Sequence, residues 1–150
     1  MSTLPLSEQA STALRRALGA EHAAVWVYGL AGAFVDEAQA ESAVAEAASN
    51  HRRFRERTEQ LLREAGVEPP VAQPAYSPPQ PVTDRNSAIR LLITAESDCA
   101  TGWRSVLETT KISRIRQHAL DGLTTTATQA TRWRITIGEQ PAALPFPGRP

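Results

Sequence analysis

A proline-rich segment near the middle of the chain constrains its fold more than any other feature. Residues 67–82 contain six prolines, namely Pro69, Pro70, Pro74, Pro78, Pro79 and Pro81. Proline has no amide hydrogen and fixes φ near −65°, so this segment cannot be helical and is expected to be extended. Helical periodicity lies on both sides of it. The prolines therefore divide the chain into two halves that one long connection must join.

Each half is predicted to contain two helices. Capping residues and helix breakers place these helices at about 8–34, 37–65, 84–109 and 113–137. Ser7 is a good N-cap for the first helix, and Asp36 followed by Gln39 is typical of the start of the second. Gly66 and Gly138 are typical C-terminal stops. At 150 residues and 41% hydrophobic content, residues 1–150 are expected to form a single domain.

The length of the proline-rich connection predicts the topology. Sixteen extended residues reach roughly 50 Å, whereas a helix of about 26 residues is roughly 39 Å long. The connection can therefore cross the whole bundle, while the other two connections are short hairpins. This combination predicts an all-α, ferritin-like four-helix bundle with up-down-down-up topology. The alternative is a flexible linker between two separate helical hairpins, each of which would expose its apolar face.

Three of the predicted helices carry an apolar stripe that one ionisable residue interrupts near its middle. The interrupting residues are Glu21, His51 and Glu96. An unpaired buried charge costs several kcal/mol, so each must be neutral, paired, hydrogen-bonded or bound to a cation. In the predicted topology all three lie roughly 18 to 23 Å from the same end of the bundle. They are interpreted as one central polar layer of candidate metal ligands, and Thr126 of the fourth helix reaches the same level.

Composition excludes several functional classes. Sixteen basic residues balance sixteen acidic ones, so nucleic acid is not expected as a partner. No basic start followed by an apolar run, and no run of about 18 uncharged apolar residues, is found. The protein is expected to be soluble and cytoplasmic, without membrane contact. Cys99 is the single cysteine, and its place on an apolar stripe indicates a small core residue rather than a nucleophile.

Four further features receive structural interpretations. His22 points about 100° away from Glu21 around the helix and is expected at an interface edge or in solvent. His118 is too near the start of its helix, and off its stripe, to join the layer. Glutamates interleave an arginine cluster, which indicates a solvated, salt-bridged face rather than a binding patch; the arginines are Arg52, Arg53, Arg55, Arg57 and Arg63. Bulky contacts at helix or subunit seams are assigned to Trp26, Trp103 and Trp133.

Several short motifs carry a resemblance to a known group of proteins. They are Glu21-His22-Ala23-Ala24, Tyr28-Gly29, His51-Arg52-Arg53, the segment 96–103 and Phe146-Pro147-Gly148. Over nearly its whole length the chain resembles the ferritin-like superfamily. More closely, it is similar to a family of small ferritin-like proteins of unknown function from high-GC Gram-positive bacteria.

The resemblance implies a partial ligand set. Di-iron members of the superfamily place a Glu on each of two helices and a Glu-x-x-His pair on each of the other two. Glu21 and Glu96 match the single glutamates and His51 matches one paired histidine. The position of its expected glutamate partner, three residues before His51, is occupied by Ala48, and the fourth helix has no Glu-x-x-His pair. Half of the ligands are therefore missing, which disfavours a ferroxidase centre.

The partial ligand set leaves two possible states for the central polar layer, one with a bound metal ion and one without. In one, a single Fe, Mn or Zn ion is bound by Glu21, His51, Glu96 and water, with Tyr28 and Thr126 next to the ligands. Tyr28 resembles a tyrosine that some ferritins keep near their iron. In the other the site is vestigial and holds no metal, and the carboxylates share protons in a hydrogen-bonded network that fixes helix register.

The sequence assigns no reaction or substrate. One kind of function is a metal-dependent redox or metal-handling protein. The alternative is a non-catalytic helical module that acts by association, as a homodimer through a helix face or with another protein. In that case the extended tail 139–150 would pack along its own bundle or a neighbour's. A serine or cysteine hydrolase is disfavoured because the apolar stripes hold no nucleophile with a base and an orienting group.

Overall fold

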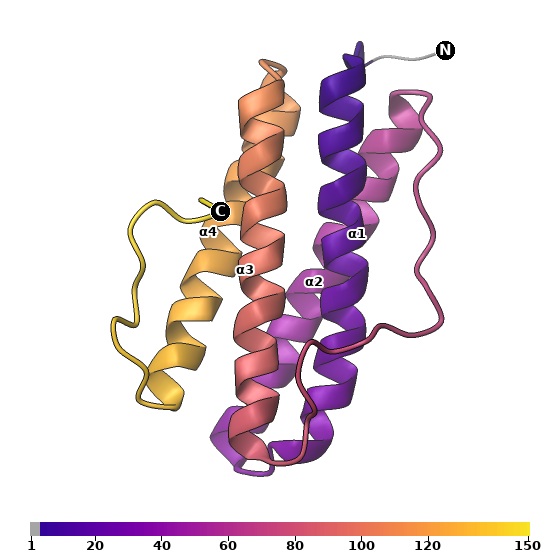
Figure 1. Ribbon diagram of the computed structural model, residues 1–150. Coiled ribbons are helices and arrows are strands. Elements are labelled where there is room, and N and C mark those ends of the chain that lie inside the picture. The colour runs from indigo at the N-terminus through magenta and orange to yellow at the C-terminus, as the bar shows by residue number, and fades with distance from the viewer. Residues whose placement is uncertain (1–3) are drawn as a thin grey trace.

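Four long helices lie side by side in the computed structural model, which describes residues 4–150 (Figure 1). They are α1 (Glu8–Ala31), α2 (Ala38–Glu64), α3 (Arg85–Thr109) and α4 (Ser113–Thr136), and a short 3-10 helix, η1 (Gly32–Phe34), follows α1. The described residues contain no strand. The prediction of an all-α four-helix bundle is confirmed.

The helices have the up-down-down-up topology that the crossover length predicted. In Figure 1, α1 and α4 run in one direction, and α2 and α3 in the other. Extensive packing joins α1 to α2, α1 to α3 and α3 to α4, whereas contacts between α2 and α4 are sparse. The two short connections are hairpins, and the segment after α2 travels the length of the bundle to reach the start of α3.

Local sequence explains most of the helix ends. The Ser7 hydroxyl accepts the Ala10 amide at 3.1 Å. At the start of α3, the Asp84 carboxylate accepts the Ser87 amide at 2.8 Å and the Ser87 hydroxyl accepts the Asp84 amide at 3.0 Å. This reciprocal capping box satisfies two amides that the helix leaves unpaired. At the end of α2, Gly66 has a φ of 75°, a left-handed conformation that suits glycine and stops the helix.

Two predicted boundaries differ from the structure. The N-cap of α2 is Glu37 rather than Asp36, and its side chain forms no capping hydrogen bond. Instead, the Glu37 carboxylate lies 2.7 Å from the Arg85 guanidinium at the start of α3, so an interhelix ion pair replaces the cap. The α-helical part of α1 ends at Ala31, and its last predicted turn forms η1.

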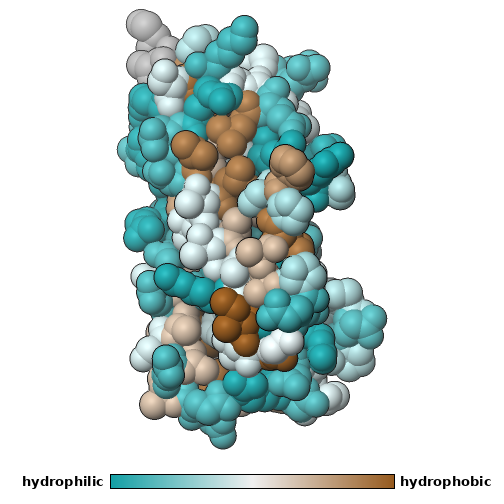
Figure 2. All heavy atoms as spheres, turned by 90° about the vertical axis from the view of Figure 1, so that its left-hand side faces the viewer, coloured by the Kyte–Doolittle hydropathy of each residue, from teal (hydrophilic) through white to brown (hydrophobic). Residues whose placement is uncertain are grey.

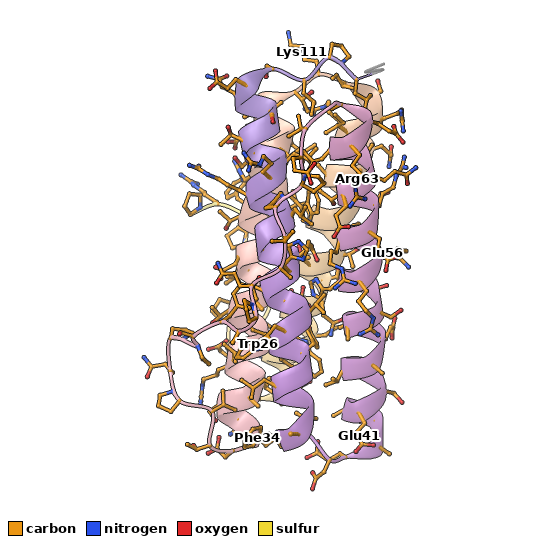
Figure 3. All side chains as sticks on the ribbon, turned by 90° about the vertical axis from the view of Figure 1, so that its right-hand side faces the viewer. Trp26, Phe34, Glu41, Glu56, Arg63 and Lys111 are labelled. Atoms are coloured by element: carbon orange, nitrogen blue, oxygen red, sulfur yellow. The ribbon has the colours of Figure 1, made fainter. Side chains whose placement is uncertain are left out.

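The crossover covers one side of α1, and this overturns the surface position expected for His22. Its side chain is only 6% exposed, and its Nε2 atom lies 3.0 Å from the carbonyl oxygen of Pro70. Further along, the ring of Tyr76 lies 6.0 Å from that of Trp26, on the face of α1 that the crossover passes (Figure 3). His22 is buried because a segment distant in sequence lies over it, and helix geometry alone could not reveal this.

The C-terminal tail folds back over α3 and α4 of its own bundle, which is one of the two expected arrangements. The Arg134 guanidinium of α4 donates to the Ala142 carbonyl at 3.2 Å. Gly148 lies so close to α3 that a Cβ atom there would be 2.5 Å from the Ala100 carbonyl oxygen. Leu144 and Phe146 stay 49% and 64% exposed. On the face that contains the tail and α4, hydrophobic residues are interrupted by hydrophilic ones (Figure 2).

The helices are amphipathic rather than apolar on all sides. Across the described residues, no helix combines the length and the apolar character needed to cross a membrane.

Candidate metal centre

His51 lies between the two carboxylates that share its level in the bundle. Its Nδ1 atom is 2.5 Å from Glu21 Oε2, and its Nε2 atom is 2.8 Å from Glu96 Oε1. The three residues come from α2, α1 and α3 and are at most 2% exposed. The structure therefore brings the three candidate ligands of the sequence analysis into one buried layer.

Three aromatic side chains extend this layer and hold its carboxylates in place. The Trp103 indole donates to Glu21 Oε1 at 2.8 Å. The Tyr28 hydroxyl donates to Glu96 Oε1 at 2.5 Å and accepts the Trp133 indole N–H at 2.7 Å. The sequence predicted only bulky contacts for the two tryptophans. Their positions on otherwise apolar helix stripes were nevertheless a usable signal, because a buried indole N–H generally needs an acceptor.

Cys99 is the functional candidate that sequence reasoning missed. Suitable ligand atoms of Glu21, His51 and Cys99 all lie within 4.8 Å of one another, and all three residues are buried. Cys99 follows Glu96 by three residues on α3, so both side chains lie on the same helix face. That spacing was the available signal, although an apolar stripe with one cysteine normally indicates packing. These residues form a buried group that could hold a metal ion.

Thr126 shares the level of the layer, but its hydroxyl bonds to its own helix. It donates to the Gly122 carbonyl at 2.8 Å, and the side chain is 1% exposed. This hydrogen bond satisfies the threonine locally. Among the expected neighbours of the ligands, Tyr28 is therefore the one whose hydrogen bond to a layer carboxylate is formed directly.

Electrostatics favour a proton on His51. Burial lowers the pKa of His51, but its hydrogen bonds with Cys99 and with the two carboxylates outweigh burial and raise the pKa well above the usual value. An imidazolium can donate from both ring nitrogens, which matches the two carboxylate contacts. Burial raises the pKa of Glu96, although the hydrogen bond with His51 opposes that shift.

The neighbouring thiol and phenol are held in their neutral forms. Burial, followed by the nearby Glu21 charge, raises the pKa of Cys99 well above its usual value. Burial, followed by the Glu96 charge, does the same for the pKa of Tyr28. Metal binding through Cys99 would therefore have to displace a proton, because the thiolate is the form that binds metals.

The donor set fits a single metal ion better than two. It offers a carboxylate oxygen, an imidazole nitrogen and a sulfur, a combination compatible with zinc or ferrous iron. Glu96 Oε2 is buried and has no hydrogen-bond partner among the described residues, so it is a further oxygen that a metal could satisfy. Because both ring nitrogens of His51 contact carboxylates, one of these contacts must open for the imidazole to bind a metal.

Comparison with known proteins identifies the family. Residues 13–150 match the family described as "Domain of unknown function (DUF4439)". The chain belongs to this family. The DUF4439 match covers all four helices except the first five residues of α1, and it includes every residue of the polar layer.

A crystal structure supports the relationship. The DUF4439 chain described here is similar to the conserved hypothetical protein Rv2844 from Mycobacterium tuberculosis, with 34% sequence identity and a TM-score of 0.83. The similarity covers 87% of this chain and 98% of the mycobacterial chain. Proteins with curated descriptions include no significant match to the sequence.

Proposed function

We propose that the protein binds one divalent transition-metal ion in its core, through Glu21, His51 and Cys99, with Glu96 as a fourth ligand. The observation that carries this proposal is the convergence of three chemically different donor atoms within 4.8 Å in a buried layer. The unpartnered Oε2 atom of Glu96 supports it. Such an atom is costly to bury, and a cation would offset that cost.

The donors favour zinc or ferrous iron over manganese. Zn²⁺ is commonly bound by four protein donors drawn from cysteine, histidine and carboxylates. Fe²⁺ accepts imidazole and carboxylate ligands, whereas Mn²⁺ prefers sites made of oxygen donors. A sulfur donor from Cys99 therefore argues against manganese as the resident ion.

The proposed role is metal retention or handling rather than conversion of an organic substrate. None of the four residues that supply these donors, Glu21, His51, Glu96 and Cys99, is more than 2% exposed. A substrate of even modest size would have to separate the helices to reach them. Four protein donors would also complete a tetrahedral site, the arrangement typical of structural zinc rather than of catalytic zinc with an open position.

A second candidate is a non-catalytic helical module whose polar layer fixes the register of the helices. It is favoured by the contacts already formed, because both His51 nitrogens and both Glu21 oxygens have partners. In this candidate the protein acts by association, as a homodimer or with another protein. Leu144 and Phe146, 49% and 64% exposed, supply apolar surface for that contact.

Metal retention separates the two candidates. The purified chain is incubated anaerobically with Fe(II), Zn(II) or Mn(II) in separate samples, desalted and analysed for metal content and helicity. The metal-binding proposal expects about one equivalent of zinc or iron in the wild type and its loss in Glu21→Gln and Cys99→Ser. His22→Gln, which changes a buried residue outside the layer, is the matched control and should retain the metal.

Two results would contradict the metal proposal. A folded wild type that retains no metal would favour the helical-module candidate. Retention of a full equivalent in folded Glu21→Gln and Cys99→Ser variants would show that the metal binds elsewhere. Circular dichroism on the same samples separates loss of metal from loss of fold.

A further inference from the structure

The sparse contact between α2 and α4 leaves a groove on the bundle surface, outside the polar layer. Its volume is about 670 Å³, which lies within the range typical of small-molecule sites. From α2 the groove is lined by Arg53, Phe54 and Arg57. From α4 its lining includes Arg114, His118, Leu120 and Asp121.

The deepest lining residues are two aromatic rings. The rings of Phe54 and His118 have centroids 5.5 Å apart, and their residues are 5% and 9% exposed. Behind them, the Trp103 ring meets His118 edge-on at 4.9 Å. The same groove also contains Leu120, which is 50% exposed. These contacts give the groove an apolar floor of two aromatic rings whose planes are tilted by 50° to each other.

Two arginines beside this floor have no carboxylate partner among the described residues. The Arg53 guanidinium lies over the Phe54 ring, 5.6 Å from its centroid. The Arg57 guanidinium donates to the neutral amide oxygen of Gln60 at 3.1 Å. They lie one turn apart on α2, so both can reach the same ligand.

Of the other charges along the groove, that of Arg114 is paired, because its guanidinium donates to Glu64 at 2.7 Å. The Asp121 carboxylate accepts the neutral Gln117 amide at 3.1 Å and keeps its negative charge, so the two arginines of α2 outnumber it by one. Elsewhere on α2, Arg55 and Arg63 pair with Glu56 and Glu59, which lie at 3.7 and 3.4 Å. The salt-bridged face expected from sequence therefore describes these two arginines, but not the pair in the groove.

The polar end of His118 is turned into the protein rather than into the groove. Its Nε2 atom lies 2.9 Å from the Thr58 hydroxyl oxygen, and that hydroxyl donates to the Phe54 carbonyl. Nε2–H therefore donates to Thr58. Burial and the Arg57 charge lower the pKa of His118 to about 4, so at neutral pH the ring adds aromatic surface without charge.

We propose that the groove between α2 and α4 binds a small organic anion with an apolar body. The body covers the Phe54 and His118 rings, and its carboxylate or phosphate group pairs with Arg53 and Arg57. Guanidinium groups suit this role because they bind both kinds of oxyanion with paired hydrogen bonds. An aromatic floor and cationic walls together select against neutral apolar molecules and against small inorganic anions.

The proposal can be tested with a fluorescent probe of the required chemistry. 1-Anilinonaphthalene-8-sulfonate combines an aromatic, apolar body with an anionic group. Its dissociation constant is measured for the full chain and for the Arg53→Gln/Arg57→Gln double variant. The matched control is Arg52→Gln/Arg55→Gln, which removes the same charge from the same helix but leaves the lining of the groove intact. We expect at least a tenfold weaker affinity in the groove variant and less than a twofold change in the control.

Competition identifies the head group. 2-Naphthoate and 1-naphthyl phosphate are each titrated against the bound probe, with the uncharged 2-naphthalenemethanol as a reference. Displacement by the naphthoate, the phosphate or both, but not by the alcohol, supports the proposal and assigns the preferred oxyanion. Equal displacement by the alcohol would mean general apolar adsorption and would overturn it.

A second measurement locates the ligand. The His118 ring signals in the NMR spectrum should shift on addition of 2-naphthoate to the wild type and stay in place in the Arg53→Gln/Arg57→Gln variant. His118 signals that do not change at saturating 2-naphthoate would place binding elsewhere and overturn the assignment. So would an equal affinity for the fluorescent probe in the wild type, the groove variant and the control variant.

Discussion

Gly122 of α4 lies directly against the indole ring of Trp103 of α3. A Cβ atom built on Gly122 would be 2.6 Å from Trp103 Nε1 and 2.7 Å from Cδ1, distances that no side chain can occupy. The same indole donates its N–H to Glu21. The missing side chain at position 122 therefore allows the helix packing that orients a donor toward the polar layer.

Gly122→Ala is expected to destabilise the protein, although alanine favours helices over glycine by about 1 kcal/mol. The added methyl group must displace a ring that is held by a hydrogen bond, and overpacking of this kind costs about 1–3 kcal/mol. Gly29→Ala is the matched control, because its Cβ would have no other atom within 4 Å; it should stabilise by up to about 1 kcal/mol. Denaturant unfolding of both variants measures this, and equal stabilisation would contradict the packing argument.

Cobalt spectroscopy tests the role assigned to Cys99. Co(II) bound by the wild type should show the intense near-ultraviolet charge-transfer absorption of a cobalt–thiolate bond. Cys99→Ser should lose that absorption, because a neutral hydroxyl is a poor ligand for this ion. The weaker visible bands of the wild-type cobalt complex should have the intensity typical of four-coordinate cobalt. Cobalt bound with no thiolate band would exclude Cys99 and leave the carboxylates and His51 as the ligands.

Sequence periodicity predicted the level of the polar layer because helix rise is nearly constant. Glu21, His51 and Glu96 each interrupt an apolar stripe, and a rise of 1.5 Å per residue fixes their heights once the topology is known. The topology itself followed from the prolines in residues 67–82. These features are local or nearly so, and they need no knowledge of side-chain packing.

The details that sequence did not provide depend on contacts between distant segments. The burial of His22 requires the path of the crossover near Pro70. The approach of Cys99 to His51 depends on the rotation of α3 about its axis, which an apolar stripe specifies only to within part of a turn. Glu37 occupies the N-cap position of α2 without capping it, because its carboxylate pairs with Arg85, and that pair spans two helices. Likewise, Arg53 and Arg57 of the groove can be recognised as unpaired only when the ion-pair partner of each neighbouring glutamate is known.

Metal affinity is expected to rise with pH. The raised pKa values of His51 and Cys99 mean that a metal must displace protons from the imidazole and the thiol. Each displaced proton changes the apparent affinity by about tenfold per pH unit. Zinc competition with a chromophoric chelator, corrected for the chelator's own protonation, should show at least a tenfold gain between pH 6 and 7. A pH-independent affinity would mean that the metal is bound without these two ligands.

His118 is expected to make folding stability sensitive to mild acid. Its pKa is about 4 in the folded protein and near 6.5 in an unfolded chain, because burial and, to a lesser extent, the Arg57 charge disfavour the imidazolium. Between these values the unfolded chain binds the extra proton, so the contribution of His118 is fully present above pH 6.5 and is lost as pH falls toward 4.

The stability of the wild type relative to His118→Gln should therefore decrease over that interval, by at most about 1.4 kcal/mol per pH unit. Denaturant unfolding of both proteins at pH 4.5, 5.5, 6.5, 7.5 and 8.5 measures this difference, and the two highest pH values serve as the control because the difference should be constant there. A difference that does not change between pH 4.5 and 6.5 would show that His118 is not held neutral by the groove floor.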